Sequence, residues 1–197
     1  MSQILQSLYK TLLAGLVLLV LVLFITSSVT GQSIQFGHAW GSFVMRWLHV
    51  ICGVMWIGLL WYFNFVQIPS MPSIPDEQKP AISKVIAPAA LFWFRYAALA
   101  TVITGLLLAW MQKYIVQALT LQLPFAAIGI GMWIALVMAF NVWFIIWPNQ
   151  KKALGMVVVE PAEKAKAART AMLTSRINTL LSITMLYMMV AQQNGGL

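Results

Sequence analysis

Residues 12–29 read LLAGLVLLVLVLFITSSV, eighteen residues without a charged side chain. The hydrocarbon core of a bilayer is about 30 Å thick, and a helix of roughly 20 apolar residues crosses it. Four further stretches are long and apolar enough to do the same. The sequence therefore predicts an all-α bundle in a single membrane domain over residues 1–197, with five transmembrane helices near residues 12–29, 43–66, 93–111, 125–147 and 171–191.

The first of these stretches also permits a second interpretation. Lys10 precedes its leucine-valine run, and Ser27 and Ser28 follow it, a pattern that a secretory signal peptide shares. Because the chain that begins at Met1 retains the segment, we expect a transmembrane helix. Five prolines between residues 67 and 90 predict an irregular loop after the second span.

The composition excludes several classes of protein. Hydrophobic residues make up 61% of the chain and charged residues only 8%, whereas a soluble domain is roughly half apolar and about a quarter charged. Lipid must cover part of so much apolar surface, which excludes a soluble enzyme and a disordered linker. Cys52 is the single cysteine, so neither an internal disulfide nor a cysteine-based zinc site can form.

The positive charges predict the orientation. Ten of the twelve Lys and Arg residues fall on the side of the first residues, and only Arg46 and Lys113 fall on the other. By the positive-inside rule, the N-terminus is cytoplasmic and the C-terminus external, as in a multi-pass protein of the bacterial inner membrane. The net charge of +8 is thereby explained by membrane orientation, and we expect membrane lipids rather than nucleic acid as partners.

Small residues recur at every fourth position along the third and fourth spans. Such stripes allow two membrane helices to approach closely, because lipid supplies no hydrophobic drive between helices. We therefore expect both stripes to meet a helix, either in this chain or in a partner subunit. The stripes are Ala97, Thr101, Gly105 and Ala109 in the third span, and Ala127, Gly131, Ala135 and Ala139 in the fourth.

His49 is the main candidate for chemistry, because an ionisable residue inside a span is a functional candidate by default. Arg46 precedes it by three residues and shares its helix face, and Gly53 follows one turn later. A histidine in a span often only bonds a neighbouring backbone or side chain, and we expect that role first. The alternative is an axial haem ligand, because a glycine at that spacing leaves room for a flat macrocycle. His38, in the predicted outer loop, is the other histidine.

A second group of polar residues gathers near the predicted inner ends of the spans. Such side chains often satisfy neighbouring backbone groups, and a pocket for an anionic ligand or a quinone headgroup is the alternative. The group is Asn64, Arg95, Asn141, Asn149, Arg176 and Asn178.

Three blocks of the sequence resemble a known family. Trp47-Leu48-His49 is followed by Gly53, Trp56-Ile57-Gly58 and Tyr62-Phe63; Trp93-Phe94-Arg95 is followed by Gly105; and residues 141–152 read NVWFIIWPNQKK. These blocks, within residues 43–66, 93–110 and 129–190, resemble the membrane domain of the bacterial membrane-bound urate hydroxylases. In that family a cytochrome c domain follows the membrane domain and takes electrons from urate oxidation. The resemblance implies a helical membrane fold that is shared with a family of redox enzymes.

The chain also departs from that family. Two positions that match histidines of the family are Gly129 and Arg176 here, so His49 alone remains of a possible ligand set. The sequence ends at Leu197 without a Cys-x-x-Cys-His haem motif. These departures predict that the fold is inherited and the activity is not.

Two functional hypotheses follow from the sequence. The first is a non-enzymatic accessory or scaffold subunit, packed among other membrane protein subunits of a respiratory or photosynthetic complex. The second is a urate-hydroxylase-like redox membrane protein that binds haem through His49. A bound lipid or quinone is compatible with either hypothesis.

Overall fold

The computed structural model describes residues 2–196, and every regular element in this part of the chain is helical. Four helical segments are long and apolar enough to cross a membrane: Leu8–Thr30, His38–Ser73, Lys79–Met111 and Ala126–Ala153. The predicted all-α membrane bundle is thereby confirmed, and the chain is a multi-pass membrane protein.

The contacts within the chain divide it into two compact units, one up to Gly41 and one from Ser42 onward. The first unit contains α1 (Ser2–Leu5) and α2 (Leu8–Thr30). The stretch 12–29 lies within α2, as expected of a transmembrane helix. Gly31 ends α2 in the left-handed conformation with φ 68°, which glycine adopts at little cost.

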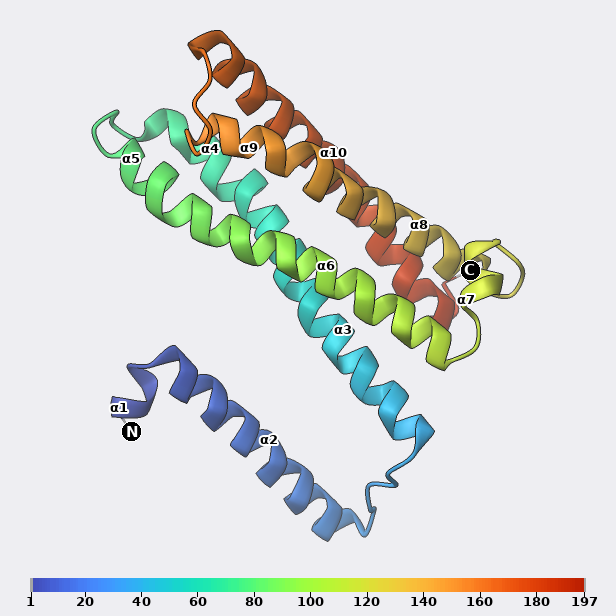
Figure 1. Ribbon diagram of the computed structural model, residues 1–197. Helices are drawn as coiled ribbons and strands as arrows, with labels where there is room; N and C mark the ends of the chain where they lie inside the picture. Colours follow the sequence, from blue (N-terminus) through green and yellow to red (C-terminus); the bar gives the residue numbers. More distant parts are fainter. Residues whose placement is uncertain (1, 197) are drawn as a thin grey trace. The chain divides into compact units, whose positions relative to one another are not determined.

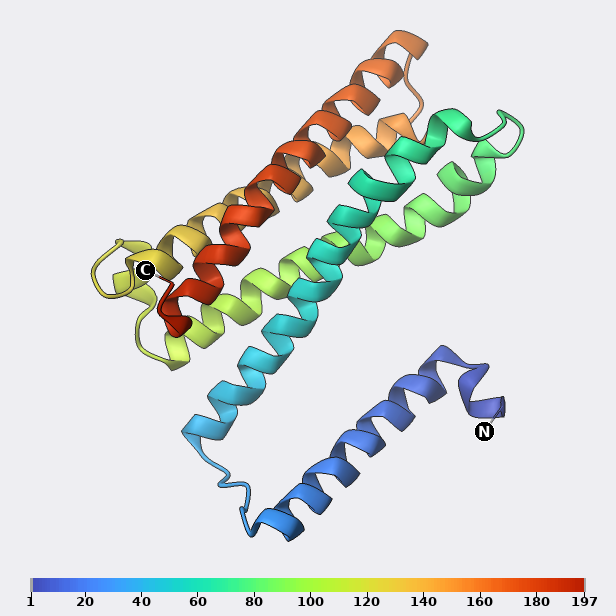
Figure 2. The ribbon, with the colours of Figure 1, turned by 180° about the vertical axis from the view of Figure 1, so that it is seen from behind.

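The second unit is a bundle of four long helical segments that run alternately up and down (Figures 1 and 2). They are built on α3 (His38–Trp61, in this unit from Ser42 onward), α6 (Ala87–Met111), α8 (Ala126–Phe140) and α10 (Pro161–Asn194). The short α7 (Ile115–Leu119) lies between α6 and α8 at one end of the bundle, and α10 packs along α8. The core gathers residues from all four segments. Within it the rings of Phe63, which follows α3, and Phe94 of α6 touch edge to face, 5.7 Å between centroids.

Three π-helical turns allow these helices to continue past prolines. The turns η1 (Tyr62–Gln67), η3 (Ile82–Ile86) and η4 (Asn141–Ile146) each end two residues before a proline, namely Pro69, Pro88 and Pro148. Proline lacks an N–H and its ring crowds the carbonyl four residues earlier. The wider π turn accommodates both defects.

The irregular loop predicted over residues 67–90 is therefore wrong. Most of that region is helical, and only residues 74–78 lie outside helices. Short helical elements extend the long segments: two of them follow η1, one precedes η3, and one follows η4. They are α4 (Ile68–Ser70), η2 (Met71–Ser73), α5 (Lys79–Ala81) and α9 (Trp147–Ala153).

The predicted fifth span, residues 171–191, lies within α10, a helix of 34 residues. α10 is not among the four segments that are apolar enough to cross a membrane, because polar residues lower its mean hydropathy. Four of these polar residues are buried and recur on one face of the helix: Thr174, Ser175, Asn178 and Ser182. The polar face of α10 is thus its inner face, the reverse of an amphipathic helix in water.

Candidate functional site in an apolar cavity beside His49

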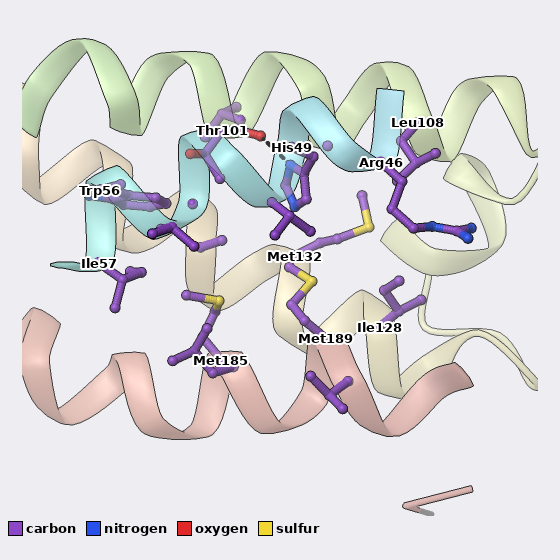
Figure 3. Close-up of a pocket in the computed structure, with 18 of the residues that line it drawn as sticks. Arg46, His49, Trp56, Ile57, Thr101, Leu108, Ile128, Met132, Met185 and Met189 are labelled. Carbon is purple, nitrogen blue, oxygen red and sulfur yellow. Dashed lines mark hydrogen bonds between the residues drawn. The ribbon is translucent and has the colours of Figure 1, made fainter. Parts of the chain in front are cut away.

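A cavity of about 600 Å³ lies within the second unit, bordered by α3, α6, α8 and α10. Its volume falls in the range of about 300–1,000 Å³ that is usual for sites of small molecules and cofactors. Arg46, Leu108 and Ile128 lie at one end of the cavity, and Trp56 and Ile57 lie at the other (Figure 3). Most of the lining is apolar; the polar side chains are Arg46, His49, Thr101, Tyr114, Gln193 and Asn194.

His49 projects from α3 and is anchored on α6. Its Nδ1 lies 3.0 Å from the carbonyl oxygen of Thr101 and 3.2 Å from Oγ1 of Thr104. A carbonyl oxygen can only accept, so Nδ1 carries the proton and donates it to Thr101. The lone pair of the neutral ring is then on Nε2, which faces the cavity (Figure 3). A backbone bond at one nitrogen that leaves the other free is the usual arrangement of a metal-binding histidine.

Gly105 makes room for this imidazole. A Cβ built at Gly105 would lie 2.8 Å from Cε1 of His49, closer than real Cβ contacts allow. At Gly53, by contrast, a Cβ would lie 3.9 Å from the methyl group of Thr101, an ordinary contact. Hence Gly105 leaves the space for the histidine ring, whereas Gly53 lines the cavity.

The small residues of α6 are covered by other parts of the same chain. Thr101 and Gly105 touch the residues of α3 described above. Ala97 is buried in the main core, and Ala109 packs in a cluster with Ala118 of α7 and Ile128 of α8. The small residues of α8 face α10: a Cβ at Gly131 would lie 3.2 Å from Cβ of Met188 and 3.4 Å from the backbone nitrogen of Met189. Ala135 is buried, whereas Ala127 and Ala139 are half-buried. Both stripes therefore serve contacts within this chain.

Three methionines complete the wall opposite His49. Met132 belongs to α8, and Met185 and Met189 are one turn apart on α10. Figure 3 shows Met132 and Met189 on the side toward which the free nitrogen of His49 points. A thioether is a flexible, polarizable group and a known axial ligand of haem iron. Sequence reasoning missed these residues, although the four-residue spacing of Met185 and Met189 marks a common helix face.

A cation and a phenol occupy the end of the cavity near α7. Nε of Arg46 is buried and has no hydrogen-bond partner among the described residues. Tyr114, which follows α6, is 7% exposed and stacks on Phe125 with 5.1 Å between ring centroids. Burial raises the pKa of the Tyr114 phenol, while the positive charge of Arg46 acts in the opposite direction. The phenol therefore stays protonated at neutral pH and can donate a hydrogen bond.

The polar group predicted near the inner ends is divided among separate contacts. Asn178, fully buried on α10, accepts from Nδ2 of Asn141 at 2.8 Å and donates to the carbonyl of Met138 at 3.0 Å. Asn64 donates to the hydroxyl of Ser175 at 2.8 Å. These bonds link η1 and η4 to α10, as expected of polar side chains that join membrane helices.

The remaining members of that group lie apart. Asn149 donates to the carbonyl of Ile145 in its own helical segment at 2.8 Å, and Arg176 is exposed. Arg95 donates to the carbonyl of Leu91, and its guanidinium carbon lies 3.3 Å from the ring centroid of Trp147. Arg95 is thus engaged with an aromatic face, a favourable cation–π contact.

Gly129 and Arg176 stand at the two positions for which the sequence resemblance suggested a histidine. Gly129 lies against α7, and a Cβ there would collide with the carbonyl oxygen of Ala118. Arg176 points away from the buried face of α10. Neither position lines the cavity, so His49 is the histidine that faces it.

Comparisons with family models, with curated proteins and with solved structures find no match to this chain.

Proposed function

We propose that this protein is a membrane subunit of a larger redox assembly and that it holds haem within the bilayer through His49. The observation that carries the proposal is the tautomer of His49. Its Nδ1 donates a hydrogen bond to the Thr101 carbonyl 3.0 Å away. Nε2 is thereby left free toward a cavity of about 600 Å³. This combination is what an axial haem ligand requires.

The residues that line the cavity fit a haem group in three respects. The imidazole supplies a nitrogen ligand, the apolar lining supplies the surroundings of a macrocycle, and Met132 and Met189 lie across from the imidazole (Figure 3). Bound haem would supply one-electron transfer. The chain's own part is to orient His49 through Thr101 and Gly105, and to keep water from the ring with apolar side chains.

A second candidate is a structural subunit, without redox chemistry of its own, whose cavity is filled by a lipid or a quinone. Two valines that line the cavity support it: Val54 is 68% exposed and Val190 is 59% exposed. In a membrane such exposed apolar side chains face lipid, so the cavity has a route to the bilayer. Under this proposal the partners are other membrane subunits, and the membrane is the bacterial inner membrane.

The visible absorption spectrum distinguishes the two candidates. The full chain is purified from its native membrane in mild detergent, and the haem content is measured by spectroscopy and by extraction. We expect a Soret band that His49→Ala abolishes and that the matched variant His38→Ala retains. A pure, folded wild-type protein without such a band would refute haem binding and favour the structural subunit.

A further inference from the structure

Arg46 is a cation at one end of the cavity, and none of the described residues that line this cavity carries a negative charge. Its Nε is buried and lacks a hydrogen-bond partner in residues 2–196, and its side chain lines the same cavity as His49. Arg46 as a whole is half-buried, and a buried N–H donor of a cation in a membrane protein is normally paired. We therefore expect the hydrogen-bond acceptor for Arg46 to come from a bound molecule rather than from the described side chains.

The acidic residues of the chain lie at the opposite end of the bundle. Asp76 pairs with Lys79 at 2.6 Å, and Glu163 pairs with Lys152 at 2.6 Å. Glu77 and Glu160 belong to the same two turns. These turns adjoin α4, α5 and α9 at one end of the second unit, and α7 lies at the other end (Figure 1). Arg46 lines the cavity together with Tyr114, the residue that precedes α7. None of these carboxylates is available to Arg46.

The position of Arg46 relative to His49 indicates which molecule could carry an anionic group that pairs with Arg46. Three residues along a helix correspond to a rise of roughly 4.5 Å, and both side chains line the cavity from the same face of α3. A molecule held by Nε2 of His49 would therefore have the side chain of Arg46 beside it in the same cavity. Tyr114, Gln193 and Asn194 also line the cavity, and their side chains can donate hydrogen bonds.

We propose that Arg46 binds a carboxylate of the molecule that occupies this cavity, so that the ligand is an apolar molecule with an acidic edge directed toward α7. The inference rests on the proposed function, under which the carboxylates are the propionates of haem. A guanidinium is suited to this role, because its planar fork binds a carboxylate through two hydrogen bonds. A fatty acid offers the same carboxylate, so the test separates these two sources.

The test compares a macrocycle that carries free carboxylates with one that does not. Haem-depleted full-length protein in detergent is titrated with haemin and with haemin dimethyl ester, and binding is followed by the Soret band. We expect the wild type to bind the free acid about tenfold or more tightly than the ester, as a charge-assisted pair requires. Arg46→Gln should abolish this preference by weakening the acid alone, and Arg46→Lys should restore part of it.

Lys113→Gln is the matched control, because Lys113 is the other cation at this end of the bundle, is exposed, and does not line the cavity. It should keep the wild-type preference. Equal affinities of the wild type for acid and ester would overturn the role of Arg46, while a His49-dependent Soret band would still support haem binding.

A third arm uses oleate in place of haemin. If the wild type binds oleate in an Arg46-dependent manner and binds neither macrocycle, the carboxylate is that of a lipid; the role of Arg46 then holds and the haem proposal fails. If the wild type binds none of the three probes, both proposals are refuted.

Discussion

The imidazole of His49 occupies the space that a side chain at Gly105 would need, with 2.8 Å between Cε1 and the position of a Cβ. The same ring is held by the carbonyl of Thr101, one turn earlier on α6. Two positions of one helix thus fix both the place and the tautomer of a histidine on another. The first half of α3 is thereby tied to α6 at the cavity, apart from the aromatic core that joins the two helices further along.

Gly105→Ala should displace the ring of His49. Its methyl group cannot fit beside Cε1, and such overpacking costs about 1–3 kcal/mol. We expect a lower Tm in detergent and a changed or lost Soret band. Gly15→Ala on α2 is the control, because a Cβ there meets nothing within 4 Å. An unchanged spectrum and Tm for Gly105→Ala would contradict the described position of His49.

Gly131→Leu should separate α10 from α8. A Cβ at Gly131 already lies 3.2 Å from Cβ of Met188, so a leucine must push the α10 backbone away along the contact. We expect insertion into the membrane to be retained and resistance to thermal unfolding in mild detergent to be lost. Leu16→Ala on α2 should have a much smaller effect. Equal stability of the two variants would refute the packing of α8 on α10.

Asn178 and Asn141 should show strong energetic coupling. Asn178→Leu leaves Nδ2 of Asn141 without its acceptor, and a buried unsatisfied group costs about 1–3 kcal/mol. The double variant Asn141→Leu/Asn178→Leu removes both partners and should cost less than the two single changes together. Free energies of unfolding for the wild type and the three variants form the thermodynamic cycle. Strict additivity would mean that the 2.8 Å bond makes no coupled contribution.

The orientation stays a prediction that labelling can check. In a Cys52→Ser background, single cysteines at Gln35 and Gln122 should react with an impermeant thiol reagent added to intact cells. A cysteine at Lys164 should react only after the membrane is permeabilised, because the basic turns belong on the cytoplasmic side. External labelling at Lys164 would reverse the orientation.

The four apolar segments and the helical class were predictable from the sequence alone. The reason is that crossing a bilayer depends on the length and polarity of a continuous run of residues. His49 was recognisable for a similar reason: an ionisable group within such a run is unusual wherever the neighbouring helices lie. The stripes of Gly105 and Gly131 likewise indicated that helices approach closely, but they did not indicate which helices.

Only the tertiary structure determined the partners. Thr101, whose carbonyl sets the tautomer of His49, is 52 residues away in the chain, and no local pattern encodes that pairing. The polar residues grouped near the inner ends are separated because Asn178 faces the bundle whereas Arg176, two positions earlier on α10, is exposed. The low hydropathy of α10 also became intelligible only when its polar face proved to be buried. Hydropathy is a sum over a segment, whereas a cavity, a tautomer and an unpaired cation depend on which side chains from distant segments meet.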